Sequence, residues 1–200
     1  MAERLPYPVF LQNDAKSAAR AEFRTGGTGE TIIYYFISQT VGGAIVSFDG
    51  HIHIGEHMRA GEFGHMTLYP DGKPCYCGRK GCVDSYCSTS ILGEVSGGRL
   101  EDFFERLAAG DASCEKVWDT YLDNLALSLH NLLTIFDHTV VIGGYLGQFI
   151  DPYIDELSRR VARYDPYLAG ETFLRAAKMK YEVAAVGAAA YFIEDFVSKI

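Results

Sequence analysis

The 200-residue sequence has no segment suited to a membrane and no patch suited to a phosphate backbone. Its longest apolar stretch, Ala184 to Ile193, is too short to cross a bilayer, and the N-terminus shows no basic-then-apolar signal layout. Lysine and arginine never form a run longer than two, and the net charge is −8. This acidity disfavours nucleic-acid binding by the chain alone. We expect a cytoplasmic protein without membrane contact.

The sequence also contains no internal repeat, no low-complexity tract and no evident linker. Apolar residues make up 48% of it and charged residues 22%, which suits one globular domain, alone or with a fragment of another. Predicted strands and helices alternate, so the fold class is α/β. We expect an extended segment at 1–12 and helices at 14–24, 83–92, 114–136 and 184–199, with a further helix that has Pro152 in its first turn. We expect strands at 30–38, on both sides of Asp49-Gly50, at 139–144 and at 173–179.

The most unusual stretch is 65–82, HMTLYPDGKPCYCGRKGC. Cys75, Cys77 and Cys82 form a C-x-C-x4-C pattern, and His65 precedes it by ten residues. In a reducing compartment such a cluster favours metal over disulfides, and three thiolates with one imidazole suit structural zinc. The chain must bend sharply to bring these residues together, and Gly72, Gly78 and Gly81 supply backbone freedom. The alternative is three reduced cysteines in a small core beside a coincidental histidine.

The cysteines and histidines outside this stretch give weaker predictions. Cys87 and Cys114 stand alone on predicted helices and are interpreted as small buried hydrophobes, although Cys87 is an alternative fourth ligand. Three further histidines lie on or beside the Asp49-Gly50 hairpin and are expected to be solvated: His51, His53 and His57.

Several motifs together resemble the ROK family of repressors, uncharacterised frames and sugar kinases. The segment RAGEFGHMTLYPDGKPCYCGRKGCVDSYCS resembles the family signature A-G-E-x-G-H followed by C-x-C-G-x-x-G-C-x-E. FLQNDAKSAA resembles the E-N-D-A-N segment, ISQTVGGAIVSFDG the second phosphate motif, VVIGG the adenosine-side strand and turn, and VAAVGAAA the last helix. The resemblance covers nearly the whole chain in the family's order.

The resemblance implies a set of functional residues. In the family the motif histidine and three cysteines bind zinc, here His65, Cys75, Cys77 and Cys82. Sugar hydroxyls are implied to bind Asn13, Asp14, Glu62, His65 and Asp84. Asp84 replaces the family's usual glutamate, so its shorter side chain loses or lengthens one contact. Without the family, Asn13 is interpreted as a helix cap and Asp14 as a first-turn acid.

Two functions fit the resemblance. In ROK kinases the motif aspartate is the general base, here Asp14, and ATP with Mg²⁺ supplies the phosphoryl group. The implied nucleotide glycines are Gly42, Gly43, Gly143 and Gly144. However, Ser38-Gln39-Thr40 replaces the kinase G-T-G and Tyr145 replaces a third glycine. The sequence therefore favours the sugar-sensing portion of a ROK transcriptional regulator. Such a regulator would contact DNA only through a domain outside this chain. The alternative is a fragment of a ROK sugar kinase. A zinc-ribbon nucleic-acid module fits poorly, because the net charge of −8 opposes binding to a phosphate backbone.

The implied fold is actin-like and ribonuclease-H-like, with two lobes. Residues 1–13 would be a remnant of the smaller N-terminal lobe, 14–183 the sugar- and zinc-binding larger lobe, and 184–200 a helix packing toward the smaller lobe. A D-x-G-x-T phosphate loop is missing, because Met1 aligns near the middle of the first lobe. A truncated lobe leaves apolar surface uncovered, so we expect a homo-oligomer.

Overall fold

The computed structural model describes residues 5–26, 29–197 and 199. Its centre is a five-stranded sheet in the order β3-β2-β1-β4-β5. The strands are β1 (Ile32–Ile37), β2 (Val41–Val46), β3 (Ile52–His53), β4 (Thr139–Gly143) and β5 (Leu174–Ala176). β1, β2 and β3 pair antiparallel, whereas β1, β4 and β5 pair parallel. The predicted α/β class is confirmed.

The two faces of the central strand β1 supply two separate cores. Because side chains alternate along a strand, Ile33, Tyr35 and Ile37 join the larger cluster with the long helix α5 (Ala112–Phe136). Ile32 and Tyr34 face the opposite cluster with α1 (Asp14–Gly26). The β1 residues from Ile32 to Tyr35 are each no more than 1% exposed, so the strand is buried on both faces, as its continuous apolar run predicts.

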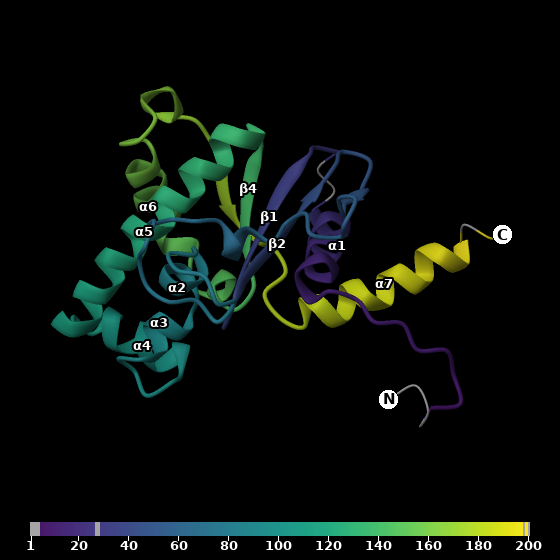
Figure 1. Cartoon of the computed structure of the whole chain (residues 1–200), viewed down its shortest axis with the longest axis horizontal. Coiled ribbons are helices and arrows are strands. Elements are labelled where there is room, and N and C mark those ends of the chain that lie inside the picture. Colours follow the sequence, from purple (N-terminus) through teal and green to yellow (C-terminus); the bar gives the residue numbers. More distant parts are fainter. Residues whose placement is uncertain (1–4, 27–28, 198, 200) are drawn as a thin grey trace.

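The helices form one layer on each face of the sheet (Figure 1). On one face, α7 (Val183–Val197) packs on α1. A side chain at Gly187 would collide with the backbone of Ser17, so the small residues of α7 serve close packing against α1. On the other face lie α5 and α6 (Ile154–Val161), with the shorter helices α2 (Asp84–Cys87), α3 (Ser90–Gly93) and α4 (Leu100–Ala108) at one end.

Most predicted elements are present, with shifted limits. The first helix continues to Gly26, and the long helix begins at Ala112, where Asp111 accepts hydrogen bonds from the backbone of Ser113 and Cys114 as its cap. The region 83–92 forms two short helices. Pro152 lies in a 3-10 turn (Asp151–Tyr153) before α6 rather than in its first turn. Helix α4 is missing from the prediction. The last helix was expected to reach Lys199, but Ser198 lies outside the described residues. Residues 1–4, at the start of the expected lobe remnant, also lie outside them.

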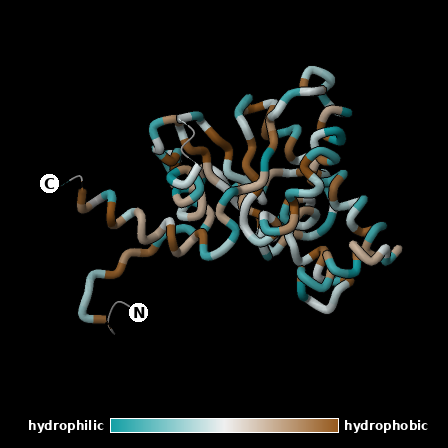
Figure 2. Tube along the Cα trace, turned by 180° about the vertical axis from the view of Figure 1, so that it is seen from behind, coloured by the Kyte–Doolittle hydropathy of each residue, from teal (hydrophilic) through white to brown (hydrophobic). Residues whose placement is uncertain are grey.

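The N-terminal segment and α7 extend together from the body of the molecule (Figure 1). Phe10 and Phe192 meet edge to face with ring centroids 5.6 Å apart. Both segments carry hydrophobic residues along their length (Figure 2), and the exposed ones include Leu5, Tyr7, Val9, Phe10, Leu11, Phe192, Ile193, Phe196 and Val197. Among the helices of the described ranges, none combines the length and apolarity required to cross a membrane. The division into lobes and the cytoplasmic location stay predictions.

Candidate sugar and metal site

Segments that carry four of the predicted sugar ligands pack against the first three residues of β2. The Asp84 carboxylate accepts a hydrogen bond from the Val41 N–H at 2.6 Å. Gly64, next to His65, lies so close to the Val41 carbonyl that no side chain would fit, and Gly61, next to Glu62, lies equally close to the Gly43 carbonyl. A side chain at Gly42 would contact the Ala15 methyl group, next to Asp14, at 3.4 Å. The two motif glycines therefore seat the Glu62–His65 turn against β2, beside the start of α1.

Asn13 and Asp14 lie exposed at the start of α1. Asn13 Oδ1 accepts the Lys16 N–H at 2.9 Å, so the predicted helix cap is observed. Asp14 Oδ1 accepts the Ala15 N–H at 2.8 Å. These bonds do not use the Asn13 amide nitrogen or the second Asp14 oxygen. The Lys16 ammonium also donates to the Met58 carbonyl at 3.1 Å, which ties the first turn of α1 to the loop preceding Glu62.

The three carboxylates differ in burial. Asp84 is only 6% exposed, whereas Asp14 and Glu62 are exposed. Burial raises the pKa of the Asp84 carboxyl, against opposing effects of the Val41 N–H and the His65 ring. Asp84 is therefore held against β2 through one oxygen, and its second oxygen is not used by that bond.

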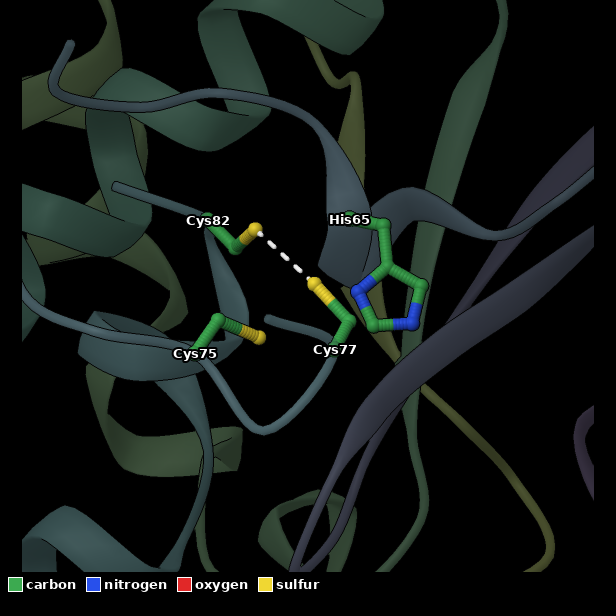
Figure 3. A group of neighbouring side chains, drawn as sticks. All are labelled: His65, Cys75, Cys77 and Cys82. Atoms are coloured by element: carbon green, nitrogen blue, oxygen red, sulfur yellow. Dashed lines mark hydrogen bonds between the residues drawn. The ribbon is translucent and has the colours of Figure 1, made fainter. Parts of the chain in front are cut away.

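The four predicted metal ligands converge (Figure 3). The ligand atoms of His65, Cys75, Cys77 and Cys82 all lie within 4.8 Å of one another, and the three sulfurs and one edge of the His65 ring face a common centre. The Cys77 and Cys82 sulfurs are 3.7 Å apart, which matches the roughly 3.8 Å edge of a tetrahedron with ~2.3 Å Zn–S bonds. His65 Nδ1 is buried and has no hydrogen-bond partner among the described residues. A cation at the centre would supply that partner.

Glycines shape the backbone of the cysteine loop, and neighbouring groups shift the pKa values of its thiols. Gly78 and Gly81 have φ of 85° and 75°, a left-handed conformation that other residues rarely adopt. Gly72 is not left-handed, contrary to our expectation; a side chain there would collide with the Tyr86 hydroxyl. Hydrogen bonds from Arg79 lower the pKa of Cys77 to about 6, and burial raises the pKa of Cys82 to about 12. A bound dication favours the thiolate form of both.

The other soft ligands behave as predicted. Cys87 and Cys114 are fully buried in the larger core, and the metal-ligand cluster found in the described residues contains His65 rather than Cys87. His51, His53 and His57 are exposed.

The predicted nucleotide glycines lie in or beside two strands: Gly42 and Gly43 are in β2, Gly143 ends β4, and Gly144 directly follows it. A side chain at Gly43 would collide with the Tyr34 carbonyl and the Phe63 ring, and one at Gly143 with the Tyr34 phenol. Gly144 has φ of +75°. Packing and backbone geometry therefore require glycine at Gly43, Gly143 and Gly144 whether or not a nucleotide binds, whereas a Cβ at Gly42 would make only an ordinary contact.

Sequence reasoning missed a cavity that is lined in part by the turn between β1 and β2 and by the residue after Gly144. A hollow of about 450 Å³ is lined by Gln39, Thr89, Ser90, Gly93, Glu94, Gly97, Gly98, Leu100 and Tyr145. Tyr145 is one of the lining residues, and its hydroxyl donates to Glu101 at 2.6 Å. That bond raises the pKa of Tyr145 to about 12. The Gly97-Gly98 pair, with both φ values positive, is a signal in the sequence that could have indicated this loop.

The chain is similar to known proteins both in sequence and in structure. The chain is 30% identical over 194 residues to the N-acetylmannosamine kinase of Escherichia coli O1:K1, covering 91% of this chain and 64% of that protein. It is 31% identical over 147 residues to the N-acetylmannosamine kinase of Yersinia pestis, covering 70% of this chain and half of that protein. The chain thus spans less than two thirds of the length of these curated relatives.

Solved structures of similar fold include kinases and one regulator. The ROK hexokinase of Thermus thermophilus superposes with a TM-score of 0.78 at 30% identity, covering 96% of this chain and 68% of that one. A ROK transcriptional regulator, a homologue of the Escherichia coli MLC protein, gives a TM-score of 0.74 at 22% identity and covers 94% of this chain and 52% of that one, a likeness that shows the fold alone. The model of the ROK family matches residues 1–195. With its motifs, its sheet and this match in agreement, the chain belongs to the ROK family.

Proposed function

We propose that this chain is the sugar- and zinc-binding part of a ROK sugar kinase that phosphorylates a hexose or an N-acylated amino sugar. This reverses the preference for a regulator that the altered phosphate motifs suggested. The relatives with 30% identity or more described above are named as kinases, and the regulator is more distant. A sugar-sensing regulator remains the second candidate, since Ser38-Gln39-Thr40 and Tyr145 depart from the kinase pattern.

The observation that supports the proposal is that the Asp84 carboxylate and the segments carrying Asp14, Glu62 and His65 pack against the start of β2. A sugar ring presents hydroxyls that both donate and accept, so its site needs several acceptors and an amide close together. Asp84 is fixed by Val41, and Glu62 and Asp14 lie on segments packed against the next two residues of the strand. The turn between β1 and β2, residues 38–40, lies directly before Val41.

In this proposal each residue has one task. Asn13, Glu62 and Asp84 hold sugar hydroxyls, and exposed Asp14 takes the proton from the hydroxyl that attacks the γ-phosphate. His65 offers Nε2 to the sugar while Nδ1 faces the thiols. The described residues fit zinc, which would be held by His65 and the three cysteines and would fix the tautomer and orientation of that ring. ATP with Mg²⁺ would occupy the hollow beside Gln39 and Tyr145.

Titration calorimetry of the full chain tests the proposal. The probes are N-acetylmannosamine and glucose, each with and without ATP and Mg²⁺. A kinase portion binds a sugar and binds ATP in addition, and sugar-dependent release of ADP would establish the reaction. Sugar binding with no ATP binding would favour the regulator, and binding of neither would contradict both.

A further inference from the structure

Tyr76 is a large aromatic residue in an unusual position. It lies between Cys75 and Cys77 in the C-x-C motif, so both of its neighbours are metal ligands in the cluster described above. Its side chain is 69% exposed, so the hydrophobic core does not require an aromatic residue here. The position is nevertheless well defined, because Cys75 is buried and its N–H donates to the Arg79 carbonyl at 2.8 Å.

The Tyr76 side chain lies against the outer nitrogen of His65. The Tyr76 hydroxyl is 3.3 Å from His65 Nε2, and the two ring centroids are 5.4 Å apart at an interplanar angle of 60°. Since Nδ1 of the same ring is buried toward the thiols, Tyr76 contacts the face of His65 that is turned away from the metal centre. That is the nitrogen through which His65 would bind a sugar hydroxyl.

Tyr76 also shares a hollow with the fixed carboxylate of the site. A polar cavity of about 300 Å³ is lined by Tyr76 and Asp84 together with Lys73, Ser85, Ser88 and Glu94, among others. Tyr76 therefore lies next to two predicted sugar ligands at once, His65 through its hydroxyl and Asp84 through the shared cavity.

We propose that Tyr76 is a further sugar-binding residue, placed by its two metal-ligand neighbours. Its ring would pack against the C–H face of the sugar, and its hydroxyl would join His65 Nε2 in holding one sugar hydroxyl, as a tyrosine with one apolar face and one polar end can do. This assignment rests on the proposed sugar-binding function. It links the two parts of the site: a metal held by the cysteines would fix the C-x-C turn, and the turn would present Tyr76 to the ligand.

The test compares Tyr76→Phe and Tyr76→Ala with a matched control, Tyr69→Phe. Tyr69 is an exposed tyrosine earlier in the same loop, whose hydroxyl donates to Asn124 at 2.9 Å. For each full-length variant, calorimetry gives the Kd for N-acetylmannosamine and for glucose, and atomic absorption gives the zinc content.

We expect Tyr76→Phe to raise the Kd of the bound sugar roughly three- to tenfold, the effect of one hydrogen bond, and Tyr76→Ala to raise it further. Tyr69→Phe should leave the Kd unchanged, and zinc content should be equal in all proteins. Wild-type affinity in both Tyr76 variants would overturn the assignment while leaving the sugar site intact. Loss of affinity only together with loss of zinc would also overturn it. A wild-type chain that binds neither sugar would overturn the proposed function as well.

Discussion

The buried carboxylate of Asp84 accepts a hydrogen bond from the backbone N–H of Val41 at 2.6 Å. This bond joins the segment after Cys82, the last cysteine of the cluster, to the first residue of β2. The aspartate stands where the family signature has glutamate, and its shorter side chain is held directly against the strand. The bond satisfies one oxygen and fixes the direction of the other.

Replacing Asp84 by asparagine separates the two roles of this side chain. The amide oxygen in Asp84→Asn can still accept the Val41 N–H, so we expect little change in thermal stability, whereas sugar affinity should fall about tenfold or more as the charged acceptor is lost. Asp84→Leu is the contrasting variant, because it leaves the Val41 N–H unpaired and should also lower the melting temperature. Unchanged sugar affinity in Asp84→Asn would remove Asp84 from the site.

Asp14 has a structural role and a proposed chemical one, and Asp14→Asn distinguishes them. The variant retains an oxygen that can accept the Ala15 N–H, so the helix start should persist and the melting temperature should barely move. If Asp14 is the general base, sugar-dependent ADP release should fall by a factor of about 10²–10⁴. Equal turnover and equal sugar affinity in the variant would leave helix capping as its only role. Asp102→Asn, on the exposed face of α4, is the control.

Glu22 tests the packing of α1 on the sheet. It is fully buried and accepts hydrogen bonds from Arg175 at 2.6 Å and from the N–H groups of Lys178 and Met179. Glu22→Ala leaves a largely buried cation and two N–H groups without this acceptor, so we expect a loss of about 3 kcal/mol in the free energy of unfolding, measured by urea denaturation.

The control for Glu22 is an ion pair on the surface. The Arg99 side chain is 70% exposed and that of Asp102 46%, and the two are 3.7 Å apart, so Asp102→Ala should change the free energy of unfolding by less than about 1 kcal/mol. A loss of similar size in both variants would show that burial of Glu22 has no special effect.

The exposed apolar residues of the N-terminal segment and α7 predict self-association. Leu11 is 100% exposed, Phe196 67% and Phe10 59%, and they lie on the two segments that extend from the body (Figure 2). Such a surface is covered in most stable proteins. Sedimentation should show a concentration-dependent oligomer that Leu11→Ser with Phe196→Ser shifts toward monomer. A wild-type chain that sediments as a monomer at every concentration would contradict this expectation.

The sequence was most informative where local chemistry determines structure. The run at Ile32–Ile37, the Asp49-Gly50 turn and the periodic apolar residues from Trp118 to Phe136 each predicted the element that is observed. The C-x-C-x4-C spacing predicted the ligand cluster for the same reason, since a few residues and their glycines determine it.

Long-range packing was harder to predict. The short β3 and β5 are strands mainly because β2 and β4 offer them partners, and their limits are not visible in the chain itself. The contact of Asp84 with Val41 and that of Tyr76 with His65 join residues whose proximity depends on the folded turn. Helix α4 was overlooked although LEDFFERLA buries Leu100, Phe103 and Phe104 at helical spacing.

The proposed function depends most on a metal ion that brings His65 and three cysteines together beneath the sugar site. Elemental analysis of the purified chain measures this directly. We predict one zinc ion per chain, lost in Cys82→Ser, with sugar affinity falling in the same variant. A chain that contains no bound metal, reacts at Cys75, Cys77 and Cys82 with a thiol reagent, and still binds sugar would contradict it.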